Sequence, residues 1–312
     1  MKYTVKKIAG LIITLLIVSM LAFLAFELIP GDPARSILGT EATESKVQAL
    51  REEMGLNRPL PQRYGQWVKD FVTGDMGTSY SYQEPVKDLI ADKLPVTFTM
   101  TAIAFVFILL FSIPIGMLSV RYENRWIDKL FLIGNQVTMS IPPFFVGMIF
   151  TVIFGLTLRL FVPGGYISYT ENVSGFLGYL IFPSLALALP KAAMTAKMFR
   201  NALLSEMHKD YIRTAKSWGN GPWRILICHA FRNGILPVIT FLGMAAADLI
   251  ANSIVIEQVF GIPGLGRTLI SSISNRDYPV VEAVIVLIAA VILILNTVVD
   301  LLYRALDKRI VL

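Results

Sequence analysis

The sequence has almost none of the residues that build disulfides and zinc centres. Its 312 residues include one cysteine, Cys228, and two histidines, His208 and His229. A single cysteine excludes an internal disulfide, and so few histidines leave little for a zinc centre. The G-x-x-x-x-G-K-[ST] motif of a phosphate-binding loop is also absent. We therefore expect no metal site, nucleotide or other cofactor in this chain.

Charged residues are scarce as well. They make up 16% of the chain, against about 25% in a typical soluble protein, while 55% of the residues are hydrophobic. The net charge of +6 does not require nucleic acid, because basic cytoplasmic loops alone can produce it. This composition predicts an all-α polytopic membrane protein in a lipid bilayer, with no nucleic acid among its partners.

The sequence does contain long apolar runs. Six of them reach the roughly 20 residues that a transmembrane helix needs. They cover residues 8–29, 96–120, 131–158, 176–196, 234–256 and 280–303. Pro142 and Pro143 interrupt the third run, and Pro183 and Pro190 the fourth. Because neighbouring helices can satisfy the carbonyls that proline frees, these breaks are tolerated in a membrane. We predict six transmembrane helices.

The distribution of lysine and arginine predicts the orientation of these helices. With the N-terminus inside, the inner segments carry many more basic residues than the two short outer loops, as the positive-inside rule requires. The outer loop 30–95 exceeds the roughly 60 residues above which loops escape this rule. Both termini are therefore predicted to be cytoplasmic. A cleaved signal peptide is disfavoured, because the first apolar run exceeds the roughly 7–15 residues of a signal core.

The chain thus divides into three predicted parts. Residues 1–29 form the N-terminal transmembrane helix, residues 30–95 a small helical extracytoplasmic domain, and residues 96–312 a five-helix core. Three short apolar stripes in the 30–95 loop lie beside a helix-ending glycine or a helix-opening proline. The stripes are Val47, Leu50 and Met54 before Gly55; Tyr64, Trp67, Val68 and Phe71 before Gly74; and Val86, Leu89 and Ile90 after Pro85. A compact cap and a docking surface for an external partner both fit this pattern.

The predicted cytoplasmic loop 197–233 holds the most polar stretch in the second half of the chain. Apolar residues recur on one helical face from Leu204 to Trp218, Gly219 follows as a helix-ending residue, and Pro222 suits the start of another helix. The pattern predicts a helix–turn–helix. Its spacing fits a hairpin resting on anionic lipid and a helix inserted into a cytoplasmic protein equally well. A DNA groove fits poorly, because both ends are tied to membrane spans.

One acid lies in the middle of a predicted span. Asp248 stands halfway along the fifth span, and Asn252 follows one turn later on the same face. A charged side chain there costs roughly 2.5–3.5 kcal/mol on insertion scales, so Asp248 is a candidate for a translocation pathway. An acid buried against a neighbouring helix and satisfied by hydrogen bonds is the alternative. We favour the pathway interpretation for Asp248 and Asn252.

Four motifs, in order along almost the whole chain, carry a resemblance to a known family. They are ELIPGDP at 27–33; GLNRPL at 55–60 with GDMGTS at 74–79; the stretch 210–237; and QVFGIPGLG at 258–266 with RDYP at 276–279. In these motifs the chain resembles the membrane-spanning permease subunit of ABC importers, in the dipeptide, oligopeptide and nickel branch.

The 210–237 stretch resembles the EAA loop of that family, whose general form is EAA-x3-G-x9-I-x-LP. RTA at 213–215 stands where EAA would be, Gly219 matches the glycine, and HAFR at 229–232 replaces I-x-LP. Members of the peptide branch typically read RTA and HALRN here, so these departures from the general form indicate the peptide branch of the family. They also remove the acidic residue of EAA. The resemblance implies that ATPase subunits receive this coupling segment through Tyr211, Arg213, Thr214, Ala215, Lys216, Gly219, His229 and Arg232.

The resemblance also implies a set of partners. A homologous second permease would complete the translocation pathway, and two cytoplasmic ABC ATPase subunits would bind ATP and Mg. An extracytoplasmic substrate-binding protein would dock on the outer side, with Trp67, Asp75 and Gly77 as the candidate docking residues in the 30–95 domain.

These expectations combine into one function. We expect a permease subunit, and not an enzyme, of a binding-protein-dependent importer in a bacterial or archaeal inner membrane, carrying di- or oligopeptides. The same architecture carrying nickel, metal chelates or opines is one alternative. A protein of another class, either an autonomous secondary transporter or a membrane receptor, is the second.

Overall fold

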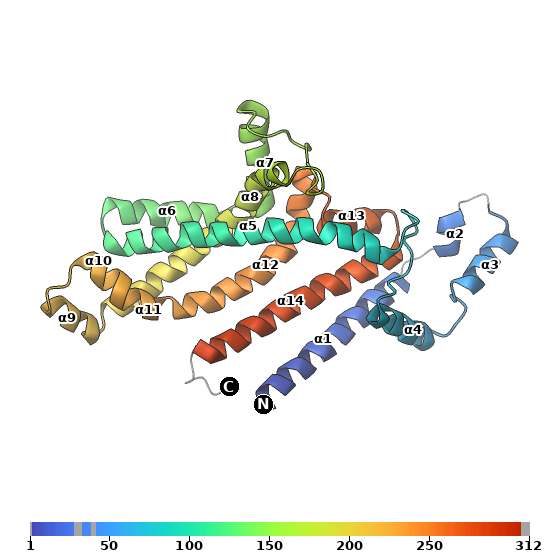
Figure 1. The fold of residues 1–312 in the computed structure, drawn as a ribbon, viewed down its shortest axis with the longest axis horizontal. Helices are drawn as coiled ribbons and strands as arrows, with labels where there is room; N and C mark the ends of the chain where they lie inside the picture. The colour runs from blue at the N-terminus through green and yellow to red at the C-terminus, as the bar shows by residue number, and fades with distance from the viewer. Residues whose placement is uncertain (1, 28–32, 39–41, 307–312) are drawn as a thin grey trace. The chain divides into compact units, whose positions relative to one another are not determined.

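The computed structural model describes residues 2–27, 33–38 and 42–306 (Figure 1). Of these described residues, 81% are helical and none forms a strand. One isolated bridge pairs Thr78 with Pro85. These features confirm the predicted all-α class. Residues 28–32, which hold most of the predicted ELIPGDP motif, lie outside the described residues.

Five helices are long and apolar enough to cross a membrane by themselves. They are Lys6–Glu27 within α1 (Lys2–Glu27), α5 (Val86–Arg121), α8 (Val173–Met207), α12 (Leu236–Phe260) and Tyr278–Leu301 within α14 (Tyr278–Leu306). Together with the bent pair described next, the described residues hold five or six candidate spans. The orientation of these helices stays a prediction from the charge distribution.

The third predicted span is a bent pair of helices. α6 (Trp126–Ser140) is followed by α7 (Pro143–Phe150) and the π-helix η1 (Thr151–Thr157), and the two halves meet at 99°. Ile141 and Pro142 between them are extended, because the residue before a proline avoids the helical conformation. Pro143 then occupies the first position of α7, where its missing N–H costs nothing.

The chain forms two compact units. The first holds residues 1–96 and 263–293, and the second holds residues 97–262 and 294–312. α5 and α14 therefore each begin in the first unit and end in the second. The sequence pattern had indicated a short helix after Pro85 and a separate span from residue 96. In the structure these are one helix, because α5 runs through Pro95 without a break. Val86, Leu89 and Ile90 form a buried apolar face that leads into the span, although charged residues stand between them.

The first unit contains the short helices of the 30–95 region together with α13 (Leu265–Ser274). α2 (Pro33–Leu38) and α3 (Glu44–Glu53) pack together, and α4 (Leu60–Thr73) follows. α3 and α4 confirm the first two predicted stripes. Gly74 ends α4 in the left-handed conformation, at φ 90°, which glycine adopts without strain. Tyr64 of α4 contacts Phe23 of α1 and lies within hydrogen-bonding distance of Ser19, at 2.8 Å.

The buried carboxylate of Asp277 organises the loop before α5. It accepts hydrogen bonds from the Ser79 hydroxyl and from the backbone N–H groups of Tyr80 (3.0 Å) and Ser81 (3.2 Å). Two motifs that are about 200 residues apart, GDMGTS and RDYP, therefore meet here. Both belong to the first unit.

The second unit is built around α8. α6, α7 and α12 all pack against it, and its buried face includes small residues such as Ala186, Ala188 and Ala192. Pro183 and Pro190 lie inside α8 without interrupting it. The Ser184 hydroxyl, beside the first of these prolines, donates to the Met100 carbonyl of α5 at 2.9 Å. The Ser119 hydroxyl of α5 donates to Asp128 of α6 at 2.6 Å.

Candidate functional site

The predicted helix–turn–helix, which we call the 204–233 segment, begins with a break that the apolar periodicity did not reveal. α8 ends at Met207, and α9 (Asp210–Ser217) starts a new helix after His208 and Lys209. The single continuous helix expected from Leu204 to Trp218 is therefore wrong. Periodicity persists across the break because α9 keeps one face on the protein, with Ile212 and Ala215 buried.

A polar cluster braces this break. Buried Glu206 accepts hydrogen bonds from the Lys209 ammonium at 2.6 Å and from the Tyr211 hydroxyl at 2.7 Å. The Asn233 amide donates in turn to the Tyr211 oxygen at 3.2 Å. The bond to Glu206 raises the pKa of Lys209, and burial, followed by the bond to Glu206, raises the pKa of Tyr211. These contacts hold the first turn of α9 in place, and Tyr211 contributes to them through its hydroxyl group.

The opposite face of α9 is exposed and carries the basic residues. Arg213, Thr214 and Lys216 are exposed, and Arg213 makes only a 3.3 Å ion pair with exposed Asp210. Trp218, expected on the buried stripe, is 79% exposed instead. The reason is that the helix ends at Ser217, so Trp218 no longer follows the helical face. A cationic face with one large aromatic ring is therefore presented outward.

The turn between the two helices matches the expected glycine and proline. Gly219 has φ +78°, a left-handed conformation, and a Cβ placed there would meet nothing within 4 Å. Pro222 opens α10 (Pro222–Arg224), which continues into the π-helix η2 (Ile225–Ala230) and α11 (Phe231–Gly234). η2 packs against α9. The π-helical geometry of η2 was not predicted.

The structure separates two of the candidate coupling residues from the exposed face of α9. His229 lies half-buried in η2, and Arg232 is exposed in α11. Neither side chain makes a hydrogen bond to another described residue. Figure 1 shows α9, α10 and α11 at one end of the second unit. His229 and Arg232 therefore lie in the same region as Tyr211 and Arg213 but share no hydrogen bond with them.

The mid-span acid has a basic partner. The Asp248 carboxylate of α12 forms an ion pair with the Lys191 ammonium of α8. The Asn252 amide donates to the Asp248 backbone carbonyl at 2.8 Å, so the two predicted pathway residues are adjacent. The Asp248 side chain is still 52% exposed in this chain, and that of Lys191 is 24% exposed. An ion pair open on one side, halfway along two candidate spans, requires water or another protein chain on that side.

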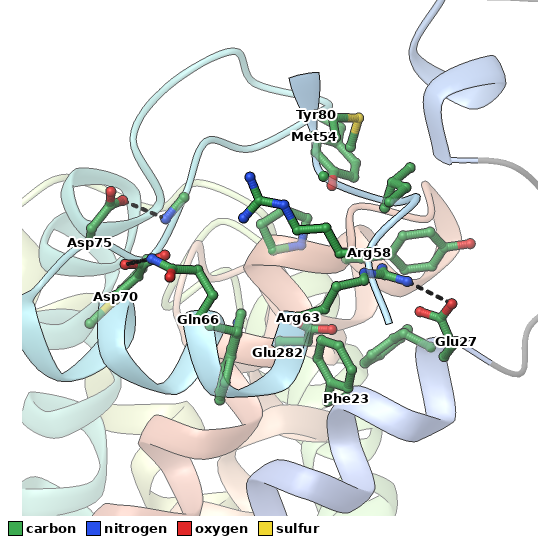
Figure 2. A pocket seen from close by; sticks show the side chains of 18 of the residues that line it. Phe23, Glu27, Met54, Arg58, Arg63, Gln66, Asp70, Asp75, Tyr80 and Glu282 are labelled. Atoms are coloured by element: carbon green, nitrogen blue, oxygen red, sulfur yellow. Dashed lines mark hydrogen bonds and ion pairs between the residues drawn. The ribbon is translucent and has the colours of Figure 1, made fainter. Parts of the chain in front are cut away.

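A pocket lies in the first unit (Figure 2). It is a cavity of about 400 Å³ between the end of α1, α4, the loops around α3 and residue 80, and the start of α14. The predicted docking residues Trp67, Asp75 and Gly77 all line it. Asp75 accepts a hydrogen bond from the Gly77 N–H at 3.0 Å and thereby shapes the turn.

Charged and aromatic groups face each other in this pocket. Arg63 donates to Glu27 at 2.8 Å, and its guanidinium lies 5.7 Å from the centre of the Phe23 ring. Glu282 of α14 also lines the cavity, although only 8% of it is exposed. Burial, together with the nearby carboxylates of Glu282 and Asp277, raises the pKa of Tyr80 far above its usual value, so its phenol stays protonated.

Comparison with known proteins identifies the chain's relatives. Residues 112–312 match the family described as the inner membrane component of binding-protein-dependent transport systems. Residues 1–101 match the N-terminal family of the same membrane components. The chain belongs to this family. It is a permease subunit of an ABC importer and a multi-pass protein of the bacterial inner membrane.

Full-length relatives of this permease agree in their names. A protein named as a peptide transport system permease of Brucella abortus is 36% identical over 305 residues, which cover 98% of this chain and 97% of the relative. The glutathione transport system permease protein of Escherichia coli is 35% identical over 310 residues, or 99% of each chain. A peptide ABC transporter permease protein of Sinorhizobium fredii is 32% identical over 308 residues, 99% of this chain and 98% of the relative.

Three charged residues were not predicted from the sequence: one in the mid-span ion pair, one at the base of α9 and one in the pocket of the first unit. Lys191 is the only lysine in the predicted fourth span, 176–196. A single basic residue inside a span could have indicated a partner for Asp248. Glu206 lies three residues before Lys209, a spacing at which opposite charges meet on a helix. Glu282 is buried in the fold, and no local sequence pattern indicates this.

Proposed function

We propose that this permease subunit forms, with a homologous second permease, the translocation pathway for di- or oligopeptides delivered by an external binding protein. ATP and Mg bind to two cytoplasmic ATPase subunits, and this chain holds no cofactor of its own. The observation that carries the proposal is the exposed basic face of α9, standing on a fixed base inside a chain of this family.

The proposed coupling step uses α9 as a rigid contact. Hydrogen bonds from Lys209 and Tyr211 to Glu206 tie the start of α9 to the end of α8. A push on α9 therefore moves α8, against which α6, α7 and α12 pack. Arg213 and Lys216 are free to pair with acidic groups on an ATPase subunit, and exposed Trp218 supplies apolar contact area.

The proposed pathway face carries the Lys191–Asp248 pair. The exposed side of this pair cannot face lipid tails without a large cost, so we assign it to the interface with the second permease. A peptide has an ammonium and a carboxylate group, and each can replace one member of the pair while it passes. Asn252, beside Asp248, supplies an uncharged polar group on the same face.

The names of the relatives favour peptide cargo over nickel, chelate or opine cargo. Two of the relatives are named for peptide transport and one for glutathione, which is itself a short peptide. Membership of a binding-protein-dependent family also speaks against an autonomous transporter or receptor. The alternative cargoes are tested in the same experiment.

The proposal is tested by reconstitution. The permease is co-expressed with the second permease, ATPase and binding-protein genes that neighbour it, and the purified assembly is placed in liposomes. We expect the ATPase subunits to co-purify and the liposomes to accumulate a radiolabelled dipeptide only with ATP and the binding protein present. Nickel, a nickel chelate and an opine are supplied in parallel.

Each outcome bears on one part of the proposal. Accumulation of nickel or an opine in place of the dipeptide overturns the cargo. A permease that purifies alone, with every neighbouring gene expressed, overturns the coupling to ATPase subunits. Uptake that continues without ATP overturns the ATP-driven mechanism.

A further inference from the structure

The pocket of the first unit holds a buried acid that the fold does not use. Glu282 lies in the second turn of α14 and is 8% exposed, yet its carboxylate makes no hydrogen bond or ion pair with any described residue. Buried polar groups are almost always hydrogen-bonded, and a buried charge without a partner is costly. Because Glu282 lines the cavity, a group inside the cavity can supply the missing partner.

Arg63, a basic residue that lines the same cavity, is already engaged. Arg63 acts electrostatically on Glu282, but its hydrogen bond goes to Glu27 at 2.8 Å, and its guanidinium also lies over the Phe23 ring. Figure 2 shows the bond between Arg63 and Glu27 at one side of the pocket. The acids and bases of this corner therefore leave Glu282 as the unsatisfied member. A cationic donor, such as an ammonium group, is the chemistry that satisfies it.

A complementary free cation lines the same cavity. The Arg58 guanidinium makes no hydrogen bond or ion pair with a described residue, whereas Asp70 and Asp75 each accept one, from Gln66 (2.7 Å) and Gly77 (3.0 Å). Guanidinium groups bind carboxylates through two parallel hydrogen bonds. The cavity thus offers one unpaired acid and one unpaired base.

Aromatic rings form much of the remaining wall. Phe26 and Tyr278 contact each other, with ring centres 5.3 Å apart, and Trp67 stacks near Phe71 and Tyr64. Rings of this kind attract cations and bury apolar side chains. A volume of about 400 Å³ lies within the range of roughly 300–1,000 Å³ found for small-molecule sites.

We propose that this pocket binds a small zwitterion of the amino-acid or short-peptide class, with its ammonium group at Glu282 and its carboxylate at Arg58. The permease itself then holds cargo at a site separate from the mid-span pair. The choice of a peptide as occupant rests on the proposed function, whereas the zwitterion chemistry rests on the pocket.

The experiment measures binding by the full-length permease in detergent, without its partners. The dipeptide Ala-Phe is titrated while the fluorescence of Trp67 is followed, with a Trp67→Phe variant to assign the signal. We expect saturable binding that weakens at least about tenfold for N-acetyl-Ala-Phe, which has no ammonium group, and for Ala-Phe-amide, which has no carboxylate. Isothermal titration calorimetry provides a second readout.

Two variants assign each end of the ligand. In Glu282→Gln, free and N-acetylated peptide should bind equally weakly, and in Arg58→Gln the same should hold for free and amidated peptide. Glu84→Gln, an exposed acid of the same unit outside the pocket, should bind like the wild type. If Glu282→Gln does not fold, the comparison of blocked and free peptides on the wild type still decides the proposal.

Several results overturn the inference. They are the absence of saturable binding, equal affinity of the wild type for free and blocked peptides, and unchanged affinity in both pocket variants. If peptide uptake by the complete transporter proceeds while the permease alone binds nothing, the pocket proposal fails and the proposed function stands. If the permease binds Ala-Phe but the assembly carries another cargo, the proposed function fails and the pocket proposal stands.

Discussion

One ion pair joins α8 to α6 and another joins α8 to α12, and the two pairs differ in their surroundings. Arg200 of α8 donates to both oxygens of Asp128 in α6, at 2.8 and 2.6 Å. Asp128 is 1% exposed and also accepts bonds from Ser119 and the Asn124 N–H. Lys191 and Asp248 form a single contact that leaves the Asp248 side chain 52% exposed.

The difference indicates which charges serve the fold and which are available for function. A buried pair with every acceptor occupied cannot exchange partners without a large cost. An open pair has room for another charged group beside it, and in a membrane it needs one side facing water or protein. The same criterion singles out Glu282 in the first unit, which is buried but has no hydrogen-bond or ion-pair partner among the described residues.

The largest effect is expected for the buried ion pair between Arg200 and Asp128. Asp128→Asn leaves the Arg200 charge buried without its partner, which typically costs about 3–5 kcal/mol. We expect a strongly lowered thermal midpoint in detergent and little monodisperse protein by size-exclusion chromatography. The double variant Asp128→Leu with Arg200→Met removes both charges and should recover most of the loss. Wild-type stability of the single variant would show that the closed pair does not hold α6 on α8.

The open pair should behave in the opposite way. Asp248→Asn is expected to keep its stability within about 1 kcal/mol, because an exposed ion pair contributes little to folding. Dipeptide uptake by the reconstituted transporter should fall about tenfold, equivalent to roughly 1.4 kcal/mol, because Lys191 then stands unpaired in the pathway. Unchanged uptake would contradict the pathway role, and unfolding like that of Asp128→Asn would contradict the comparison itself.

The sequence was sufficient to predict the elements that depend on local chemistry. Gly74 and Gly219 end their helices in the left-handed conformation, and Pro222 opens the next helix, as the spacing predicted. It was also sufficient to pair Asp248 with Asn252, because one turn of a helix separates them. All of these relations lie within about four residues.

Relations between distant segments could not be predicted in the same way. The bond between Ser79 and Asp277 and the ion pair of Lys191 with Asp248 depend on how helices pack, which no local pattern specifies. The break at His208 was missed for another reason. Apolar periodicity continued across it, although α9 is held in place by the polar bonds to Glu206 and not by continuity with α8.

The exposed face of α9 gives a smaller expected effect. Arg213→Glu and Lys216→Glu should leave folding intact, because their surface interactions are worth less than about 1 kcal/mol. We expect fewer ATPase subunits to co-purify and uptake to fall about fivefold, in the usual range of coupling energies. Lys87→Glu, which changes an exposed lysine of the first unit, should change neither quantity. Normal coupling in both α9 variants would place the ATPase contact elsewhere.

The smallest expected effect is a difference in local stability between substitutions at two glycines of the same turn. Gly219 and Gly221 both have open space where a Cβ would stand, but only Gly219 has a positive φ, +78°, whereas Gly221 is extended at −66°. Gly219→Ala should therefore cost about 1 kcal/mol of local stability through backbone strain alone, and Gly221→Ala close to none. Hydrogen exchange of the α9 and α10 amides measures this difference. Equal exchange in the two variants would mean that the turn is free to adopt another conformation, which would argue against α9 as a rigid contact for an ATPase subunit.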